Sequence, residues 1–249
     1  MRWSDGVVEA EAWGPGAEWL LDALPRWCGL HDAPDAFDPT PSARLTELWR
    51  RSGEWRLAAS GVVWQELAMT VLGQRVTTVE AMQSWAKLCR RWGEPAPGPC
   101  ELLLPPTPAV MGRLAYAELH RFGVERHRAQ ILIDAARRAD RLEEAAAMPI
   151  DDALRRLSAL PGLGPWTATV TSSITHAHPD VVVLGDYGIP TMVSYALTGR
   201  ADRVGDDRML ELLEPFTGHR HRVVRLLYNA GITAPRRAPR ARNPRIAEL

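Results

Sequence analysis

The feature that most constrains the fold is a short glycine- and proline-rich turn, PGLGP, between two stretches of helical character. Residues 151–159 carry acids in their first turn and leucines at helical spacing, which predicts a helix. Pro161 ends this helix, and Gly162 and Gly164 allow positive φ angles before a second helix over residues 166–176. The sequence therefore predicts two helices joined by a tight hairpin.

The start of the second helix offers a site for a phosphate group. The first backbone N–H groups of a helix have no intrahelical acceptor and the helix dipole is positive there, so an anion can bind without a basic side chain. Pro165 has no amide hydrogen, which leaves the other amides of the hairpin to make the contact. The expected phosphate-binding residues are Gly162, Leu163, Gly164, Trp166 and Thr167. The alternative interpretation is a turn without a ligand.

A second turn follows a short apolar run, residues 181–184, and carries the acid Asp186. Another helix is predicted just downstream, because Met192, Val193 and Ala196 share one helical face. Asp186 therefore lies at the mouth of a helix, next to buried surface. It is expected either to cap that helix or to act chemically beside neighbouring aromatic side chains.

Two segments resemble the helix-hairpin-helix Gly/Pro-Asp superfamily of DNA glycosylases. LPGLGPWTA, residues 160–168, is similar to its hairpin, and LGDYGIP, residues 184–190, is similar to its loop with the catalytic aspartate. Within the superfamily the resemblance is closest to 3-methyladenine DNA glycosylase II, the alkylation-repair branch, which has tryptophan where Trp166 stands. Residues 64–85 resemble a glutamine-containing helix and turn of that branch. The resemblance implies that Asp186 is the catalytic residue.

The resemblance also implies a pocket for the excised base. Trp166 and Tyr187 are expected to stack on a cationic base, because electron-rich rings attract cations. His219 stands near the position where the branch has another pocket tryptophan. Tyr228 fits either the pocket or the core. The expected pocket residues are thus Trp166, Tyr187, His219 and Tyr228.

Three further residues are expected to contact DNA, and they are Gln74, Arg75 and Arg220. Arg75 replaces the apolar wedge that, in the alkylation-repair branch, fills the gap left by a flipped base. Arginine can also stack in such a gap. Arg220 matches an arginine of the family and is expected either to contact a phosphate or to form a bridge to Asp186.

The function implied is that of a DNA glycosylase in base excision repair. Such an enzyme extrudes the base from the duplex, and a carboxylate such as Asp186 offsets the positive charge that develops on the sugar. An alkylated purine is already cationic and leaves readily, so 3-methyladenine-type bases are the expected substrates. The single lysine, Lys87, lies on a distant predicted helix, whereas lyase relatives carry a nucleophilic lysine at the position of Trp166. A monofunctional hydrolase is therefore expected.

Other functions remain compatible with the sequence. One is a glycosylase of the same fold that excises a different damaged base, since a fold does not fix its substrate. Another is a helix-hairpin-helix protein that binds DNA without turnover. The third is a helical bundle in which the motifs are accidental.

Composition limits the cofactors and the compartment. The cysteines are irregularly spaced and none follows Cys100, which excludes the four-cysteine iron–sulfur cluster that several superfamily members hold near the C-terminus. No metal site is expected, and a monovalent cation at the hairpin is the one ion that the resemblance leaves open. No apolar run approaches the roughly 20 residues of a membrane span. We therefore expect a cytoplasmic protein, and the resemblance implies a monomer whose partner is double-stranded DNA containing damaged bases.

The predicted fold is mainly α, with two helical subdomains, the helix-hairpin-helix motif and a short, truncated N-terminal β element. Residues 1–40 are expected to pack with the C-terminal subdomain, residues 41–150 to form the central helical subdomain, and residues 151–249 to hold the hairpin, Asp186 and a basic tail. Residues 219–245 contain eight arginines and no acid, which indicates either a phosphate-binding face or a solvated tail.

Overall fold

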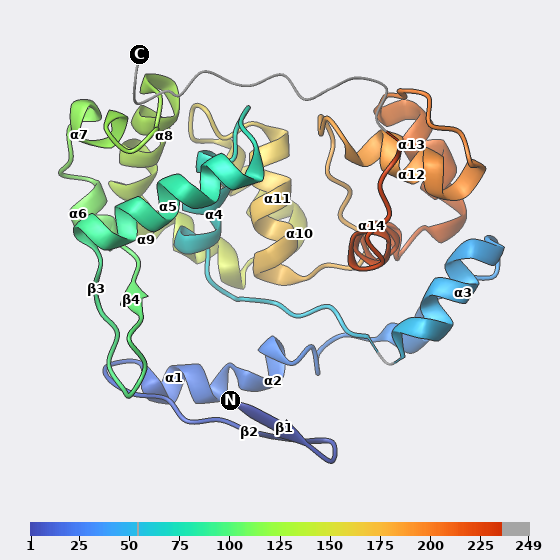
Figure 1. Ribbon diagram of the computed structural model, residues 1–249, viewed down its shortest axis with the longest axis horizontal. Helices are drawn as coiled ribbons and strands as arrows, with labels where there is room; N and C mark the ends of the chain where they lie inside the picture. Colours follow the sequence, from blue (N-terminus) through green and yellow to red (C-terminus); the bar gives the residue numbers. More distant parts are fainter. Residues whose placement is uncertain (54, 236–249) are drawn as a thin grey trace.

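The computed structural model describes residues 1–53 and 55–235, and in this part of the chain it is mainly helical (Figure 1). The α-helices are α1 Ala17–Asp22, α2 Leu24–Trp27, α3 Ala43–Ser52, α4 Trp64–Leu72, α5 Thr78–Trp92, α6 Pro108–Met111, α7 Tyr116–His120, α8 Arg126–Ala136, α9 Ala139–Glu143, α10 Ile150–Ser158, α11 Pro165–His176, α12 Ile189–Thr198, α13 Asp206–Leu213 and α14 Arg220–Asn229. The 3-10 helices are η1 Pro34–Ala36, η2 Glu144–Ala147 and η3 Glu214–Phe216. The strands are β1 Arg2–Ser4, β2 Val7–Glu9, β3 Glu94–Pro95 and β4 Leu103–Leu104.

The predicted fold class is confirmed, with helices throughout and two short antiparallel hairpins in the described residues. The hairpin of β1 and β2 is the expected N-terminal β element, with Trp3 opposite Val8. No helix among the described residues is both long and apolar enough to cross a bilayer. The arginine-rich residues 236–245 of the expected basic tail lie outside the described residues.

The first hydrophobic core is built from the central helices α4, α5, α8 and α10. Its fully buried leucines include Leu67, Leu72, Leu88, Leu132 and Leu157. In α4, for example, the buried residues Leu67, Ala68, Val71 and Leu72 lie on one face of the helix. Burying such apolar faces supplies the main favourable free energy of folding. The C-terminal subdomain was expected to begin at residue 151. Helix α10 instead packs into the first core, where its buried face contacts α11 and η2.

The second core joins part of the N-terminal segment to the C-terminal helices. It contains Leu45 of α3, Val193 of α12, Met209 of α13 and Val223 of α14. The expected boundary at residue 41 assigned α3 to the central subdomain, whereas α3 packs on α14. The physical reason is that α3 has a single buried apolar stripe, and the second core covers that stripe.

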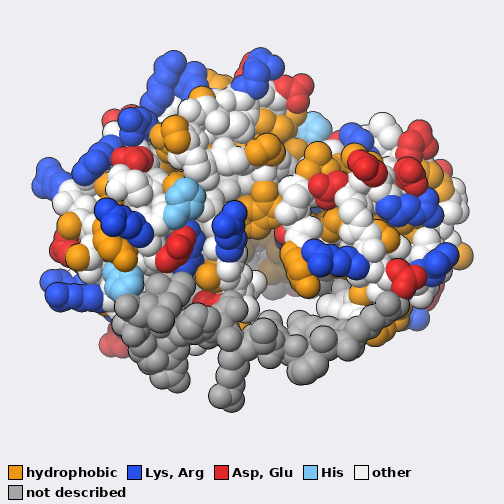
Figure 2. All heavy atoms as spheres, turned by 90° about the horizontal axis from the view of Figure 1, so that it is seen from above, with side chains coloured by type: hydrophobic (Ala, Val, Ile, Leu, Met, Phe, Trp, Pro, Cys, Tyr) orange, Lys and Arg blue, Asp and Glu red, His pale blue; other side chains and the backbone are white. Residues whose placement is uncertain are grey.

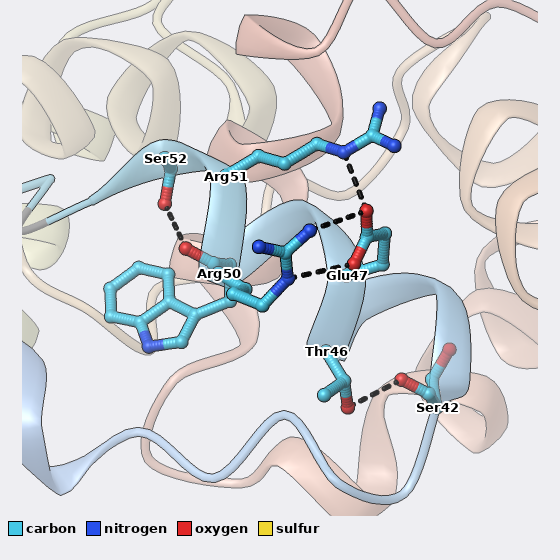
Figure 3. Close-up of polar contacts among 7 residues, drawn as sticks. Ser42, Thr46, Glu47, Arg50, Arg51 and Ser52 are labelled. Carbon is cyan, nitrogen blue, oxygen red and sulfur yellow. Dashed lines mark hydrogen bonds and ion pairs between the residues drawn. The ribbon is translucent and has the colours of Figure 1, made fainter.

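The outer face of α3 is polar. Arg50 and Arg51 both donate to the Glu47 carboxylate, and the Thr46 hydroxyl donates to the Ser42 carbonyl (Figure 3). The Ser42 side chain caps the start of the helix by accepting from the Leu45 amide. The two arginines hold the pKa of Glu47 at about 2. Because these side chains are exposed, such pairs add little to stability. We therefore assign this face of α3 a solvated, structural role.

Several local predictions needed correction. From the sequence, one helix is predicted over residues 108–119 and another over residues 124–142. Each is interrupted in the structure, giving α6 and α7, and α8 and α9. Apolar periodicity continues across both breaks because the two pieces pack on the same core, so the pattern alone does not reveal them. The sequence also predicts Thr78 as the cap of the helix that follows it, whereas the cap of α5 is Thr77, in a capping box with Glu80.

Helix α11 lies between the two cores. Ala168 faces the first core, while Trp166 and Val170 pack against the second. The loop from α10 into α11, the turn between α4 and α5 and the loop before α12 all lie along the upper edge of Figure 1. The two motifs singled out in the sequence thus meet where the subdomains adjoin.

Candidate active site

The hairpin between α10 and α11 has the expected tight geometry. Gly162 has φ 89°, and a Cβ atom placed there would lie 2.4 Å from the Ile131 side chain, so two constraints favour glycine at this position. Leu163 is buried in the first core and anchors the loop. Its amide donates to the Leu160 carbonyl at 3.0 Å. The core thus fixes the base of the hairpin.

The tip of the hairpin faces solvent. Gly164 has extended backbone, and nothing lies within 4 Å of the position that a Cβ atom would take. Trp166 and Thr167 are the second and third residues of α11, where amides have no intrahelical acceptor. This arrangement allows an anion to approach the positive end of the helix.

Gln74 ties the hairpin to the turn between α4 and α5. Its Nε2 donates to the Gly162 carbonyl at 3.2 Å and to Thr167 Oγ1 at 2.9 Å. The adjacent Arg75 is exposed and adopts φ 57°, a conformation that costs energy for a residue with a side chain. Gln74 is therefore engaged with protein, while Arg75 stands at the tip of the turn.

A buried arginine holds the end of α4. Arg128 is 2% exposed, and its Nη1 donates to the Leu72 carbonyl at 2.6 Å, the last residue of that helix. A cation at a helix C-terminus is stabilised by the carbonyl dipoles. Burial lowers the pKa of Arg128 below its ordinary value. No sequence pattern marks this contact, which holds the end of α4 just before the turn that carries Arg75.

Asp186 is held through both carboxylate oxygens. Oδ1 accepts from the amides of Gly188 and Ile189, at 2.8 and 2.9 Å, and so holds the start of α12, whose N-cap residue is Gly188. Oδ2 accepts from the indole Nε1 of Trp166 at 3.0 Å. The preceding residue is fixed as well, because the Gly185 amide donates to Asp206 Oδ2 at 2.8 Å. Asp186 consequently holds the start of α12 and is itself fixed in orientation.

Trp166 reaches Asp186 through its N–H edge. The side chain is partly buried and packs against the second core. The sequence predicted a stacking surface, but it did not reveal the hydrogen bond, which depends on a side-chain rotamer. Trp166 follows the hairpin directly, so a single residue joins the candidate phosphate site to the candidate catalytic carboxylate.

All the donors to Asp186 are neutral. Among the described residues, no arginine, lysine or histidine lies within ion-pair distance of its carboxylate. Tyr228, half-exposed on α14, lies close enough that burial and the charge of Asp186 together raise the pKa of its hydroxyl. The negative charge of Asp186 is therefore oriented, and no described side chain forms an ion pair with it.

A hollow of about 440 Å³ opens beside Asp186. It is lined by Gly185, Asp186, Tyr187, Pro190, Arg203, Val204, Gly205 and Asp206. Tyr187 is 81% exposed, and the guanidinium carbon of Arg203 lies 4.8 Å from the centre of its ring. Sequence reasoning missed Arg203, because it lies in a loop 16 residues beyond Tyr187 with no motif around it.

His219 and Arg220 make their contacts elsewhere. Arg220 forms a two-point ion pair with Asp180, at 2.9 and 2.5 Å, which replaces the bridge to Asp186 considered from the sequence. The His219 ring lies against Phe37, with centroids 5.6 Å apart, and accepts from Arg222 Nε. Burial and Arg222 lower the pKa of His219. The structure thus gathers Trp166, Asp186, Tyr187 and Tyr228.

The face that carries the hairpin is shown in Figure 2. Hydrophobic side chains gather in its central depression, and basic side chains stand on both sides. A surface of this kind suits a ligand with apolar faces and a charged backbone. The described part of the chain contains no group of three or more histidine, cysteine or acidic residues arranged to hold a metal ion.

Comparisons with solved structures identify the fold. No protein-family model matches the chain, and neither does any curated protein sequence. The 3-methyladenine DNA glycosylase from Archaeoglobus fulgidus is similar over 90% of this chain and 77% of its own, with TM-score 0.76 and 21% identity. The DNA-3-methyladenine glycosidase from Bacillus halodurans is similar over 80% and 89%, with TM-score 0.58 and 17% identity.

A third neighbour is named for a different base. The 8-oxoguanine glycosylase/lyase from Clostridium acetobutylicum, in complex with double-stranded DNA, is similar over 86% of this chain and 75% of its own, with TM-score 0.68 and 12% identity. The chain therefore has the fold of the helix-hairpin-helix DNA glycosylases, as its sequence motifs predicted. Since this fold accommodates enzymes for different lesions, the site must carry the argument for substrate.

Proposed function

We propose that this chain is a DNA glycosylase that hydrolyses the N-glycosidic bond of alkylated purines in double-stranded DNA, as the first step of base excision repair. The observation that carries the proposal is the Asp186 carboxylate, which the described residues hold through neutral donors only. One of these donors is Trp166 of the hairpin helix, and Asp186 lines an open hollow. Similarity of fold to glycosylases of two lesion classes supports the reaction type.

The chemistry follows from the charge of this carboxylate. A base within a duplex is reached by extruding its nucleotide. As the glycosidic bond breaks, positive charge develops on the sugar, and an oriented carboxylate without a cationic partner stabilises that charge or directs a water molecule to it. Asp186 performs this role, with Trp166 keeping its Oδ2 in place.

The class of substrate follows from the number of acids in this mechanism. A neutral leaving group needs a second acid to protonate it. A purine alkylated on a ring nitrogen is already a cation and departs without that help, so one carboxylate suffices. An exposed aromatic ring such as Tyr187 also attracts a cationic base more strongly than a neutral one. Tyr228 borders the same carboxylate.

The reaction ends at the abasic site. Strand cleavage in lyase-type relatives requires an amine nucleophile that forms a Schiff base. Trp166 occupies the corresponding position of the hairpin helix, and the single lysine of the chain, Lys87, lies on α5 in the first subdomain. We therefore propose a monofunctional hydrolase.

DNA contacts are assigned to the elements around the carboxylate. The hairpin amides from Gly162 to Thr167 bind one phosphate, and such contacts fix position without reading sequence. Arg75 fills the gap left by the flipped nucleotide, since the turn between α4 and α5 presents it toward solvent. Gln74 supports this turn from the protein side.

The test is incubation of the purified protein with methylated duplex DNA, with released bases separated by chromatography. We expect free 3-methyladenine and an intact strand until the abasic sites are cleaved by heat or alkali. Release of a different base from a panel of lesion duplexes would assign another substrate to the protein and leave the proposed reaction unchanged. Binding to duplex DNA with no release from any lesion would contradict the proposal.

A further inference from the structure

The hollow beside Asp186 already contains a planar cation. Arg203 lies in the loop between α12 and α13, and its guanidinium is stacked over the ring of Tyr187. Both residues are exposed, and both line the hollow together with Asp186 and Asp206. The cation is therefore not part of the core, and the contact that holds it in the hollow is the one with the Tyr187 ring.

Guanidinium shares three properties with a purine alkylated on a ring nitrogen. Each is flat, each carries a delocalised positive charge, and each gains from the electron-rich face of an aromatic ring. The volume of about 440 Å³ is sufficient for a nucleobase beside Asp186. The same ring face cannot hold both cations, because they would occupy one position and repel each other.

We propose that, in the free protein, Arg203 occupies the position on the Tyr187 ring where the cationic base binds. An extruded alkylated purine then displaces Arg203 from this ring. Arg203 is then a specificity-determining residue that competes with the substrate from within the chain. This inference rests on the proposed function and deepens it, since it names the ring on which the base stacks. Removing the guanidinium strengthens the binding of cationic bases.

Asp206 favours a cationic base, rather than a neutral one, as the group that replaces Arg203 in the hollow. It accepts from the Gly185 amide and remains at the wall of the hollow, as does Asp186. When the arginine swings out, two carboxylates are left facing a hollow that a cationic base enters. A neutral base does not offset the charge of these two carboxylates. Once Arg203 has left, the hollow therefore binds cationic bases more strongly than neutral ones.

The experiment compares wild type with Arg203→Gln, Arg203→Lys and a matched control, Arg208→Gln. Arg208 is an exposed arginine on neighbouring α13 that pairs with Glu211 and does not line the hollow. Two quantities are measured for each protein. They are the enzyme concentration giving half-maximal single-turnover release of base from methylated duplex DNA, and the Kd for the same duplex without methylation.

We expect the ratio of the first quantity to the second to fall about two- to fivefold in Arg203→Gln, the range that an exposed cation–π contact supports. Arg203→Lys keeps the charge and stays within about twofold of wild type, as does Arg208→Gln. An unchanged or increased ratio in Arg203→Gln overturns the inference, and so does an equal change in Arg208→Gln. A wild-type protein that releases no base at all contradicts the proposed function instead.

Discussion

Two aspartates of this molecule are both tightly held, yet by opposite kinds of partner. Asp32 meets the fully buried Arg222 of α14, whose Nη1 and Nη2 donate to its two oxygens at 2.9 and 2.5 Å. The Leu57 amide donates to Asp32 as well, at 2.8 Å. Asp186 receives three donors too, but all of them are neutral N–H groups.

The difference lies in what happens to the charge. Burial opposes ionisation of Asp32, but Arg222 and the backbone amides outweigh it, so the pKa of Asp32 lies below its ordinary value. That negative charge is neutralised inside the protein and fastens the N-terminal segment to α14. The charge of Asp186 is fixed in direction only, and it remains available to a positive charge on a ligand. Hydrogen bonds fix the position of both carboxylates. The charge of Asp186 stays available because no described cation forms an ion pair with it.

The largest effect is expected for Asp186→Asn, which removes the charge and keeps the size of the side chain. Base release from methylated DNA should fall by about 10³-fold, the scale of losing a principal electrostatic contact to the transition state. Binding to undamaged duplex should persist. The measurement is single-turnover release beside a DNA titration.

Asparagine cannot satisfy every donor at this position. Its NH₂ group would face either the Trp166 indole or the amides of α12, so thermal unfolding of Asp186→Asn must be measured too. Asp207→Asn, an exposed change in the first turn of α13, is the matched control. Full activity in a folded Asp186→Asn protein would remove the distinction between the two aspartates.

The sequence predicted the surroundings of Asp186 far better than the ion pair of Asp32 and Arg222. The hairpin and Asp186 carry local signals, namely glycines at positive φ, a helix-initiating proline and an acid before a helix. The pair of Asp32 and Arg222 joins residues 190 positions apart, and no local pattern marks either one. The contact between Trp166 and Asp186 spans 20 residues, and its parts were both identified while the bond was not.

The predicted subdomain boundaries erred for the same physical reason. Periodicity shows that α3 and α10 each have one apolar face, but it does not show which core covers that face. The stacking of Arg203 on Tyr187 was missed because it depends on how a loop returns over the Asp186 turn. Local chemistry was thus readable from the sequence, whereas the pairing of distant surfaces required the structure.

The second effect concerns stability rather than activity. Asp32→Ala leaves the Arg222 guanidinium buried without its carboxylate, and this should lower the free energy of unfolding by about 3–5 kcal/mol. Urea unfolding measures the loss. Activity corrected for the folded fraction should stay near wild type, because this pair is structural. Replacing both residues, as Asp32→Leu with Arg222→Met, should recover much of the stability; a double variant as unstable as Asp32→Ala would contradict this account.

Low pH should destabilise the region around α14 through a buried histidine. His221 of α14 is buried, and burial, together with Arg225, His178 and Arg222, lowers its pKa to about 4, although a hydrogen bond with the Val181 backbone opposes the shift. The unfolded chain binds a proton near pH 6.5, so stability from this residue is present above that pH and is lost as pH falls toward 4. We expect a decrease of up to about 3 kcal/mol across this window. Urea unfolding from pH 7 to 4 should show a shallower decrease in His221→Gln, and an equally steep decrease would assign the effect to other groups.

The smallest effect tests how neutral donors position the Asp186 carboxylate. Trp166→Phe keeps an aromatic ring against the second core but removes the indole N–H that holds Oδ2. We expect kcat for base release to fall about 10-fold, at the lower end for a lost hydrogen bond to a charged group, with little change in KM. A histidine at this position offers a ring N–H again, so Trp166→His should recover part of kcat. Equal losses in kcat and in affinity for undamaged duplex would mean that the indole supports the hairpin as a whole, and the neutral-donor account of Asp186 would then rest on the amides of α12 alone.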